Sequence, residues 1–315
     1  MTKFKFLIAI VLIVVVAYTG AWFFGANQIS TELDKFASAN AQPQISCDER
    51  SISGFPFRYD VTCKNANIID GDDQYLVQEI KATVRVYSPT HIIAFAQSPI
   101  NSRNEFTGSE RELDFTSLQL SARLNWSLEL ERVSAIADNL KWSDTLITPI
   151  ELANAKNVEA HLIATQDAET GVQAFFRVSE ANLIELNTQK ANLAVELEAT
   201  NLDRNVTNWQ YPNMLRQWQS QQGELVVHGL EFSATDMRFT ANGKLNLDAA
   251  GQLNGQVTTQ SKGLVELFDP EAYGILAPTI FGVANDEGEY KSLWQANAGT
   301  VSIGVAPLFF VPALF

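Results

Sequence analysis

The apolar residues of this chain follow one pattern at its start and a different one afterwards. Phe6–Phe24 is a run of nineteen residues without a charge, preceded by Lys3 and Lys5. A helix of that length spans roughly 28 Å, about the thickness of the hydrocarbon core of a bilayer. The run therefore predicts a transmembrane helix over residues 6–24.

Two features favour a retained anchor over a cleaved signal peptide. The apolar run is longer than the core of a signal peptide, and Trp22, Phe23 and Phe24 fit the aromatic belt of a membrane interface. Gly25 and Ala26 offer only a weak cleavage site, although cleavage stays open. Lysines before the run and an acidic chain after it predict a cytoplasmic tip (residues 1–5) and an external body.

Beyond the anchor we expect a helical stalk over residues 25–43, ended by Pro43, and then a period-two alternation typical of strands. Phe55–Cys63 and Tyr75–Tyr87 alternate, and Leu118–Leu130 does so over thirteen residues, which predicts one long strand. Its expected apolar face consists of Leu118, Leu120, Ala122, Leu124, Trp126, Leu128 and Leu130.

The alternation continues to the end of the chain with two interruptions. Residues 172–178, 193–199, 225–259 and 301–305 read as strands, with a tight turn at Ala249-Ala250-Gly251. Helical spacing appears over residues 201–222, closed by Gly223, and over residues 264–281. The predicted fold class is mainly β (α+β): a long, curved, largely antiparallel sheet with two or three helices, forming one strand-rich domain over residues 44–315.

Charge and cysteine content indicate which ligands this body avoids and in which compartment it lies. The net charge of −14 over 315 residues disfavours binding to nucleic acid. Cys47 and Cys63 would lie opposite each other in a hairpin centred on Phe55, which predicts a disulfide in an oxidising compartment. Two unpaired buried thiols are the alternative.

Candidate catalytic or metal-binding groups are scattered along the sequence. His91, His161 and His228 share no motif, and we interpret them as sheet-face or solvated side chains. The acidic pairs Asp72-Asp73 and Asp286-Glu287 lie beside glycines and lack the spacing of a calcium loop. We expect no metal, no cofactor and no enzymatic activity; a hydrolase acting through paired carboxylates is the least favoured alternative.

The stretch Gly54-Phe55-Pro56-Phe57-Arg58-Tyr59-Asp60 is the most distinctive local motif, with Arg58 and Asp60 spaced to pair on one face of a strand. Together with the anchored N-terminus, WQSQQGELVVHGLEFSATDMRFTANGKLNLDAAGQLNGQVTTQS and the apolar end APLFFVPALF, it resembles an uncharacterised alphaproteobacterial family, domain of unknown function two-one-two-five. The family motif is Gly54, Phe55, Pro56 and Arg58. The disulfide is predicted from this sequence alone.

The meander around residues 243–257 also resembles the AsmA-like envelope proteins. That looser resemblance implies a groove for lipid acyl chains and a role in envelope lipid homeostasis or outer-membrane biogenesis. We therefore expect a single-pass protein of the bacterial inner membrane, with a cytoplasmic N-terminus and a periplasmic body. The expected partners are the inner-membrane bilayer and lipid or envelope proteins, with no nucleic acid. The residues expected to line an apolar-ligand face are Leu118, Leu120, Leu124, Trp126, Leu128, Leu130, Phe239, Leu245 and Leu247. The alternative is a non-catalytic scaffold whose tail, residues 307–315, docks to a partner.

Overall fold

The computed structural model describes residues 2–38, 41–165, 171–184, 188–264, 284–304 and 306–315. Strands make up 60% of the described residues, and the strand pairs are antiparallel, which confirms the predicted fold class. Contacts divide the chain into two compact units, Met1–Gln119 with Trp142–Ile150 and Leu120–Lys141 with Glu151–Phe315. We call them unit 1 and unit 2. The division falls well before residues 201–222, where the alternation of the sequence breaks.

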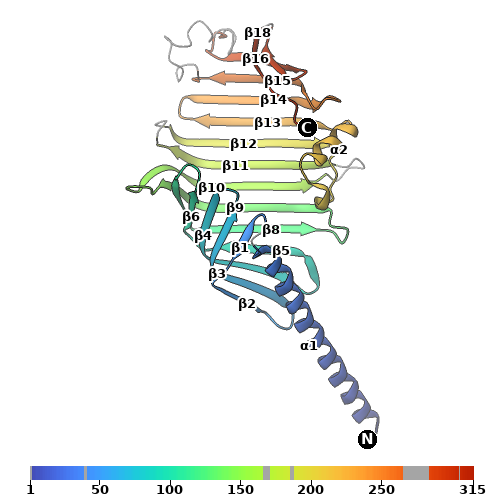
Figure 1. Cartoon of the computed structure of the whole chain (residues 1–315). Helices are drawn as coiled ribbons and strands as arrows, with labels where there is room; N and C mark the ends of the chain where they lie inside the picture. Colours follow the sequence, from blue (N-terminus) through green and yellow to red (C-terminus); the bar gives the residue numbers. More distant parts are fainter. Residues whose placement is uncertain (1, 39–40, 166–170, 185–187, 265–283, 305) are drawn as a thin grey trace. The chain divides into compact units, whose positions relative to one another are not determined.

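Unit 1 consists of the N-terminal helix and short strands around two long ones. The helix α1 covers Thr2–Phe36, so the predicted anchor and most of the predicted stalk form one continuous helix (Figure 1). The strands are β1 (Gln44–Ser46), β2 (Glu49–Ser53), β3 (Arg58–Asp70), β4 (Asp73–Arg85), β5 (Ser88–Ala96), β6 (Ile100–Asn104) and β7 (Glu110–Asp114).

The long strands β3 and β4 pair with each other along their whole lengths. Strands β1 and β2 pair with successive halves of β3, and β6 and β5 pair with successive halves of β4. Cys63, Ala66 and Val77 form the buried centre, packed against Cys47 and Ile80 among others. The core of unit 1 is therefore small and lies beside the disulfide.

Unit 2 is a meander in which each strand pairs with the next (Figure 1). Its strands are β9 (Leu130–Asp144, the last residues belonging to unit 1), β10 (Ile150–Ala164), β11 (Gly171–Leu183), β12 (Thr188–Thr200), β13 (Glu224–Ala234), β14 (Met237–Leu247), β15 (Leu253–Lys262), β16 (Tyr290–Asn297), β17 (Thr300–Ile303) and β18 (Ala306–Phe310). A 3₁₀ turn, η1 (Val206–Asn208), and the helix α2 (Asn213–Ser220) interrupt the strands between β12 and β13. The predicted hairpin turn at Ala249–Gly251 is confirmed. The predicted helix over residues 264–281 lies almost entirely outside the described residues.

The prediction of one strand over Leu118–Leu130 is wrong. Strand β8 (Ser117–Leu124) ends at Leu124, and β9 begins at Leu130. Between them Asn125 folds the chain into a turn, because its side-chain oxygen accepts hydrogen bonds from the backbone N–H groups of Ser127 (2.8 Å) and Glu129 (3.0 Å). Leu128 takes a φ of +61°, so the alternation of side-chain faces is lost there.

One smaller expectation also changes. The strand predicted from Phe55 begins only at Arg58, because Phe55–Phe57 form the turn between β2 and β3. The tail that the scaffold alternative assigns to docking, residues 307–315, starts within β18, and β18 pairs with β17.

Candidate functional site

One tryptophan fixes the second half of α1 to the strands of unit 1. Trp22 is only 5% exposed and stacks on Tyr59 with 5.1 Å between ring centroids. Its edge meets Phe55 at 5.5 Å, and its indole N–H donates to the carbonyl oxygen of Arg58 at 3.1 Å. Phe23 stacks on Phe55 at 6.3 Å. An aromatic cluster therefore joins the helix to the motif.

Two tyrosines add hydrogen bonds to this cluster. The Tyr18 hydroxyl donates to the carbonyl oxygen of Pro56 at 2.6 Å, and the Tyr59 hydroxyl donates to that of Trp22 at 3.4 Å. Burial, with Tyr18 nearby, raises the pKa of Tyr59 above its ordinary 10.0, so its hydroxyl keeps the proton it donates. A side chain at Gly25 would collide with this hydroxyl, which explains the glycine.

An ion pair between an exposed arginine and a buried carboxylate holds the motif in shape. Arg58 contacts Asp60 at 2.8 Å, which confirms the predicted pairing, and Asp60 also accepts a hydrogen bond from Thr83 at 2.8 Å. The Asp60 side chain is only 5% exposed, so its charge depends on these partners. Gly54 has a φ of +101°, and a β-carbon there would lie 2.9 Å from the carbonyl oxygen of Arg58.

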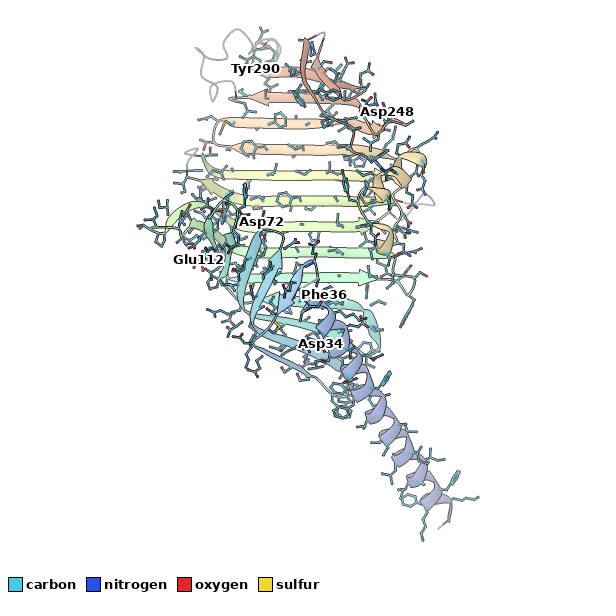
Figure 2. All side chains as sticks on the ribbon, viewed as in Figure 1. Asp34, Phe36, Asp72, Glu112, Asp248 and Tyr290 are labelled. Atoms are coloured by element: carbon cyan, nitrogen blue, oxygen red, sulfur yellow. A yellow bond between two sulfur atoms is a disulfide. The ribbon has the colours of Figure 1, made fainter. Side chains whose placement is uncertain are left out.

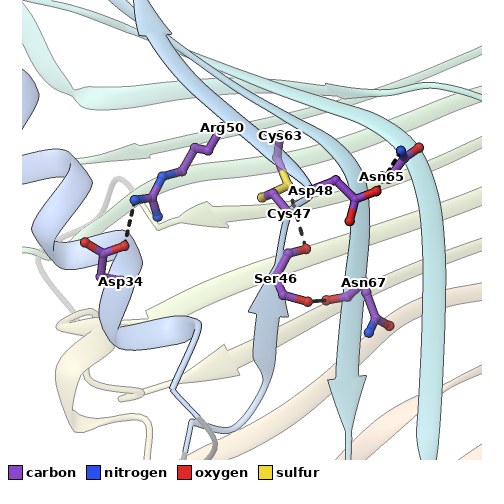
Figure 3. Close-up of a disulfide and its surroundings, with 8 residues drawn as sticks. All are labelled: Asp34, Ser46, Cys47, Asp48, Arg50, Cys63, Asn65 and Asn67. Carbon is purple, nitrogen blue, oxygen red and sulfur yellow. Dashed lines mark hydrogen bonds and ion pairs between the residues drawn. A yellow bond between two sulfur atoms is a disulfide. The ribbon is translucent and has the colours of Figure 1, made fainter.

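A second attachment of α1 lies next to the disulfide (Figure 3). Cys47 and Cys63 are bonded, with 5.4 Å between their α-carbons, as predicted. The reasoning from register was wrong, because Arg50 is the residue opposite Cys63, while Cys47 lies between β1 and β2. Arg50 reaches from β2 to Asp34 of α1 at 2.6 Å and to Ser30 at 3.1 Å.

The first half of α1 has no such partners among the described residues. Its apolar side chains from Phe4 to Val16 are 42–70% exposed, and they point away from other elements in Figure 2. Lys3–Phe36 is the one described helix that is long and apolar enough to cross a membrane. The apolar half of α1 thus extends beyond the protein body.

Unit 2 presents a second feature, a sheet face made of apolar side chains in direct register. Ala174 pairs with Leu197, Leu197 with Val227, and Val227 with Gly243. One row further along, Val172, Ala199, Leu225 and Leu245 are paired in the same way. Since side chains two residues apart on a strand share a face, these rows form one surface across β11–β14.

Two cavities lie along this surface. One, of about 290 Å³, is open to solvent on one side and bounded by the sheet, α2 and the C-terminal segment, and its lining is apolar except for Asn246. Ala199, Met214, Trp218, Leu245 and Leu314 are among the lining residues. The other, of about 330 Å³, reaches Leu197, two residues from Ala199 on the same face of β12. The two cavities therefore adjoin along one strand.

Polar contacts hold α2 over the first cavity. The Trp218 indole N–H donates to the carbonyl oxygen of Thr200 at 2.8 Å, and a β-carbon at Gly223 would overlap the indole. Asp203 accepts hydrogen bonds from the backbone of Asn205 and from Asn208 and Gln217, which hold its pKa below the ordinary 3.8. This network ties η1 and α2 together.

The structure separates the residues predicted for the apolar face into two groups. Leu245 and Leu247 line the 290 Å³ cavity, and Phe239 lies on the same strand face between Phe232 and Ser261. The residues from Leu118 to Leu130 line neither of the two cavities: Trp126 is 81% exposed in the turn and Leu130 is 2% exposed. Met214, Leu215 and Trp218 were missed as lining residues, although their helical spacing was recognised.

Within the described residues, no group of three histidine, cysteine or acidic side chains could hold a metal ion. His161 contacts Ser134 at 2.9 Å, and His228 contacts Glu198 at 2.8 Å, each within its own pair of strands. Asp72-Asp73 and Asp286-Glu287 lie at turns, as their glycine neighbours indicated.

The fold and these two features define a β-rich protein with one long apolar N-terminal helix docked on its first unit. The chain belongs to the bacterial family described as uncharacterized protein conserved in bacteria (DUF2125), whose model matches residues 22–281. The matched range begins at Trp22 and includes the motif, α2 and strands β1–β15. No curated protein and no solved structure matches the chain.

Proposed function

We propose that this protein is held in the bacterial inner membrane by α1 and that unit 2 binds a lipid acyl chain along its apolar face. The lysines before the apolar run support a cytoplasmic N-terminus, and the disulfide, which suits an oxidising compartment, supports a periplasmic body. The resemblance to AsmA-like proteins supports a role in envelope lipid homeostasis.

The cavity beneath α2 is the observation that carries this proposal. Its volume of about 290 Å³ lies near the lower end of the range for small-molecule sites, and it continues toward the second cavity along β12. Ten of its eleven lining residues are apolar. Such a lining recognises hydrocarbon by desolvation, worth roughly 2.5 kcal/mol per 100 Å² of apolar surface buried.

The test is lipid extraction from the full chain purified in detergent, followed by mass spectrometry and by titration with a fluorescent fatty acid. Ala199→Trp fills the cavity from the sheet side and should abolish both co-purified lipid and fatty-acid binding. Glu196→Trp is the matched control, because it places the same side chain at an exposed position on the opposite face of β12. Lipid binding that survives Ala199→Trp in a folded protein would overturn the proposal.

A scaffold role is supported by one observation on the tail. Phe309 and Phe310 of β18 are 54% and 58% exposed at the last strand of the meander. Truncating the tail would not separate the two functions, since Leu314 lines the cavity and accepts a hydrogen bond from Tyr211 at 2.7 Å. Replacing Phe309 and Phe310 by serine should remove a cross-linked partner and leave lipid binding unchanged if the scaffold role is correct.

A further inference from the structure

The loop between β2 and β3, residues 54–57 of the motif, contacts α1 well inside the apolar run. Pro56 accepts its hydrogen bond from Tyr18, and Phe55 packs on Trp22 and Phe23. Tyr18 precedes the end of the run at Phe24 by six residues, which corresponds to about 9 Å along the helix. The loop therefore lies beside a part of α1 that the sequence assigns to the hydrocarbon core.

Sliding the helix does not remove this overlap. If the bilayer ended just before Tyr18, only Phe6–Ala17 would be left to cross it. Those twelve residues span roughly 18 Å, well short of the roughly 30 Å hydrocarbon core. A membrane that accommodates α1 must therefore also reach the loop.

The side chains of the loop suit that environment. Phe55, which packs on α1, is 49% exposed, Phe57 in the same turn is 67% exposed, and Phe24 of α1 is 66% exposed. The carbonyl oxygen of Phe57 accepts a hydrogen bond from Val86 at 3.0 Å, which places the 72% exposed Tyr87 next to it. Exposed aromatic rings gathered in this way are typical of residues at a membrane interface.

One arginine accompanies the rings. Arg85 lies directly opposite Arg58 in the β3–β4 ladder and 6.0 Å from the ring of Tyr87. Arg58 is neutralised by Asp60, whereas Arg85 has no carboxylate within ion-pair distance among the described residues. A guanidinium beside interfacial tyrosine is suited to a lipid phosphate group.

We propose that Phe55, Phe57 and Tyr87, here called the aromatic patch, enter the interfacial layer of the same bilayer that α1 spans, with Arg85 at the level of the lipid phosphates. The proposal rests on the membrane anchoring proposed above. It makes unit 1 a second membrane contact, so that the first strands lie against the lipid surface instead of standing off on a stalk.

Site-specific fluorescence in lipid nanodiscs tests this with the full chain. Because Cys47 and Cys63 are bonded to each other, a single introduced cysteine can carry an environment-sensitive label. Labels at Phe57→Cys and Tyr87→Cys should show blue-shifted emission that is quenched by lipids carrying a spin label near the headgroup. Val14→Cys reports on the anchor itself: because it lies near the middle of Phe6–Phe24, its label should be quenched by lipids carrying the spin label deep in the acyl chain.

Phe106→Cys is the matched control, because Phe106 is an aromatic residue of unit 1 that is 85% exposed. Phe106 comes two residues after Asn104, which pairs with Asp73 at the start of β4. Tyr87 comes two residues after Arg85, at the end of β4. The two ends of β4 are twelve residues apart, or roughly 40 Å. The label at Phe106→Cys should stay water-exposed and unquenched.

The outcomes separate the two proposals. Quenching at Phe57, Tyr87 and Val14 but not at Phe106 supports the aromatic patch. Quenching at Val14 with water-like emission at Phe57 and Tyr87 overturns the patch and leaves the anchor intact. An unquenched Val14 label overturns the anchoring and the patch with it.

Discussion

Replacing Trp22 by alanine tests whether α1 is docked or merely tethered. Trp22 is the only residue of the apolar run that is buried among protein side chains, at 5% exposure. The substitution removes the stacking on Tyr59, the edge contact with Phe55 and the hydrogen bond to the carbonyl oxygen of Arg58. It changes nothing in the apolar segment before it, so membrane insertion should persist.

The expected loss is large for a single side chain. Truncating a buried tryptophan to alanine costs about 3–5 kcal/mol, because contacts are lost and a cavity remains. Trp22→Phe keeps a stacking ring and loses the indole donor, so it should cost about 1–2 kcal/mol. Phe23→Ala, at a residue 60% exposed, removes the pair with Phe55 that joins α1 to the loop, worth about 0.5–1.5 kcal/mol; the other aromatic pair of Phe23, with Trp22, lies within the helix.

Hydrogen exchange at the loop measures these losses directly. The amide of Arg58 donates to the carbonyl oxygen of Gly54, and the amide of Val86 donates to that of Phe57, so both report opening of the loop. Since 1.4 kcal/mol corresponds to a factor of ten, Trp22→Ala should speed their exchange by roughly two to three orders of magnitude. Phe23→Ala should speed it by about tenfold or less.

One result would refute the docking. If exchange at Arg58 and Val86 in Trp22→Ala matches the wild-type protein in nanodiscs, the cluster contributes nothing to holding the loop. The helix would then be a flexible tether, as a stalk of residues 25–43 implied.

Three further changes have expected outcomes. Replacing both Cys47 and Cys63 by serine should lower the free energy of unfolding of unit 1 by about 3 kcal/mol, because the disulfide closes a loop over a sequence separation of 16. Urea unfolding measures this loss. Thiol counting on the unreduced wild-type protein should find no free thiol. Gly54→Ala should lower the melting temperature more than Gly71→Ala, since both have positive φ but only Gly54 has Arg58 in the way. The stabilisation from Asp203 should be fully present above the ordinary aspartate pKa of 3.8 and disappear as the pH falls through the lower pKa of the folded state. Asp203→Asn should remove that part of the acid dependence of urea unfolding; an unchanged dependence would mean that the carboxylate is not held by its hydrogen bonds.

Regular alternation predicted the centre of unit 2 well. Strands β11–β15 follow the apolar positions of the sequence, because each strand has the same inward phase as its neighbour and the connections are short except for the η1–α2 segment between β12 and β13. The prediction failed where a polar side chain competes with the ladder. Asn125 captures two backbone N–H groups, and no count of apolar positions contains that information.

The docking of α1 was outside the reach of local patterns for a different reason. Phe55 and Phe57 carry the same alternation as Tyr59 and Val61, so they were read as one strand face. The aromatic partners of Phe55, Trp22 and Phe23, are more than thirty residues earlier in the chain, and the period of a local pattern does not report such contacts. The sequence indicated this docking only through the aromatic residues at 22–24 and at 55–59, with Gly25 beside the first group.

Two attachments of different strength decide what α1 does for the protein. Arg50–Asp34 is a partly exposed ion pair, worth at most about 1 kcal/mol, whereas Trp22 at the centre of the aromatic cluster is buried and worth several times more. The two lie twelve residues apart on α1, about 18 Å along its axis, and both bind the β2–β3 hairpin. A helix held at two separated points cannot pivot on that hairpin. Tilting α1 in a bilayer must therefore turn unit 1 with it, and α1 sets the orientation of the first unit as well as its location.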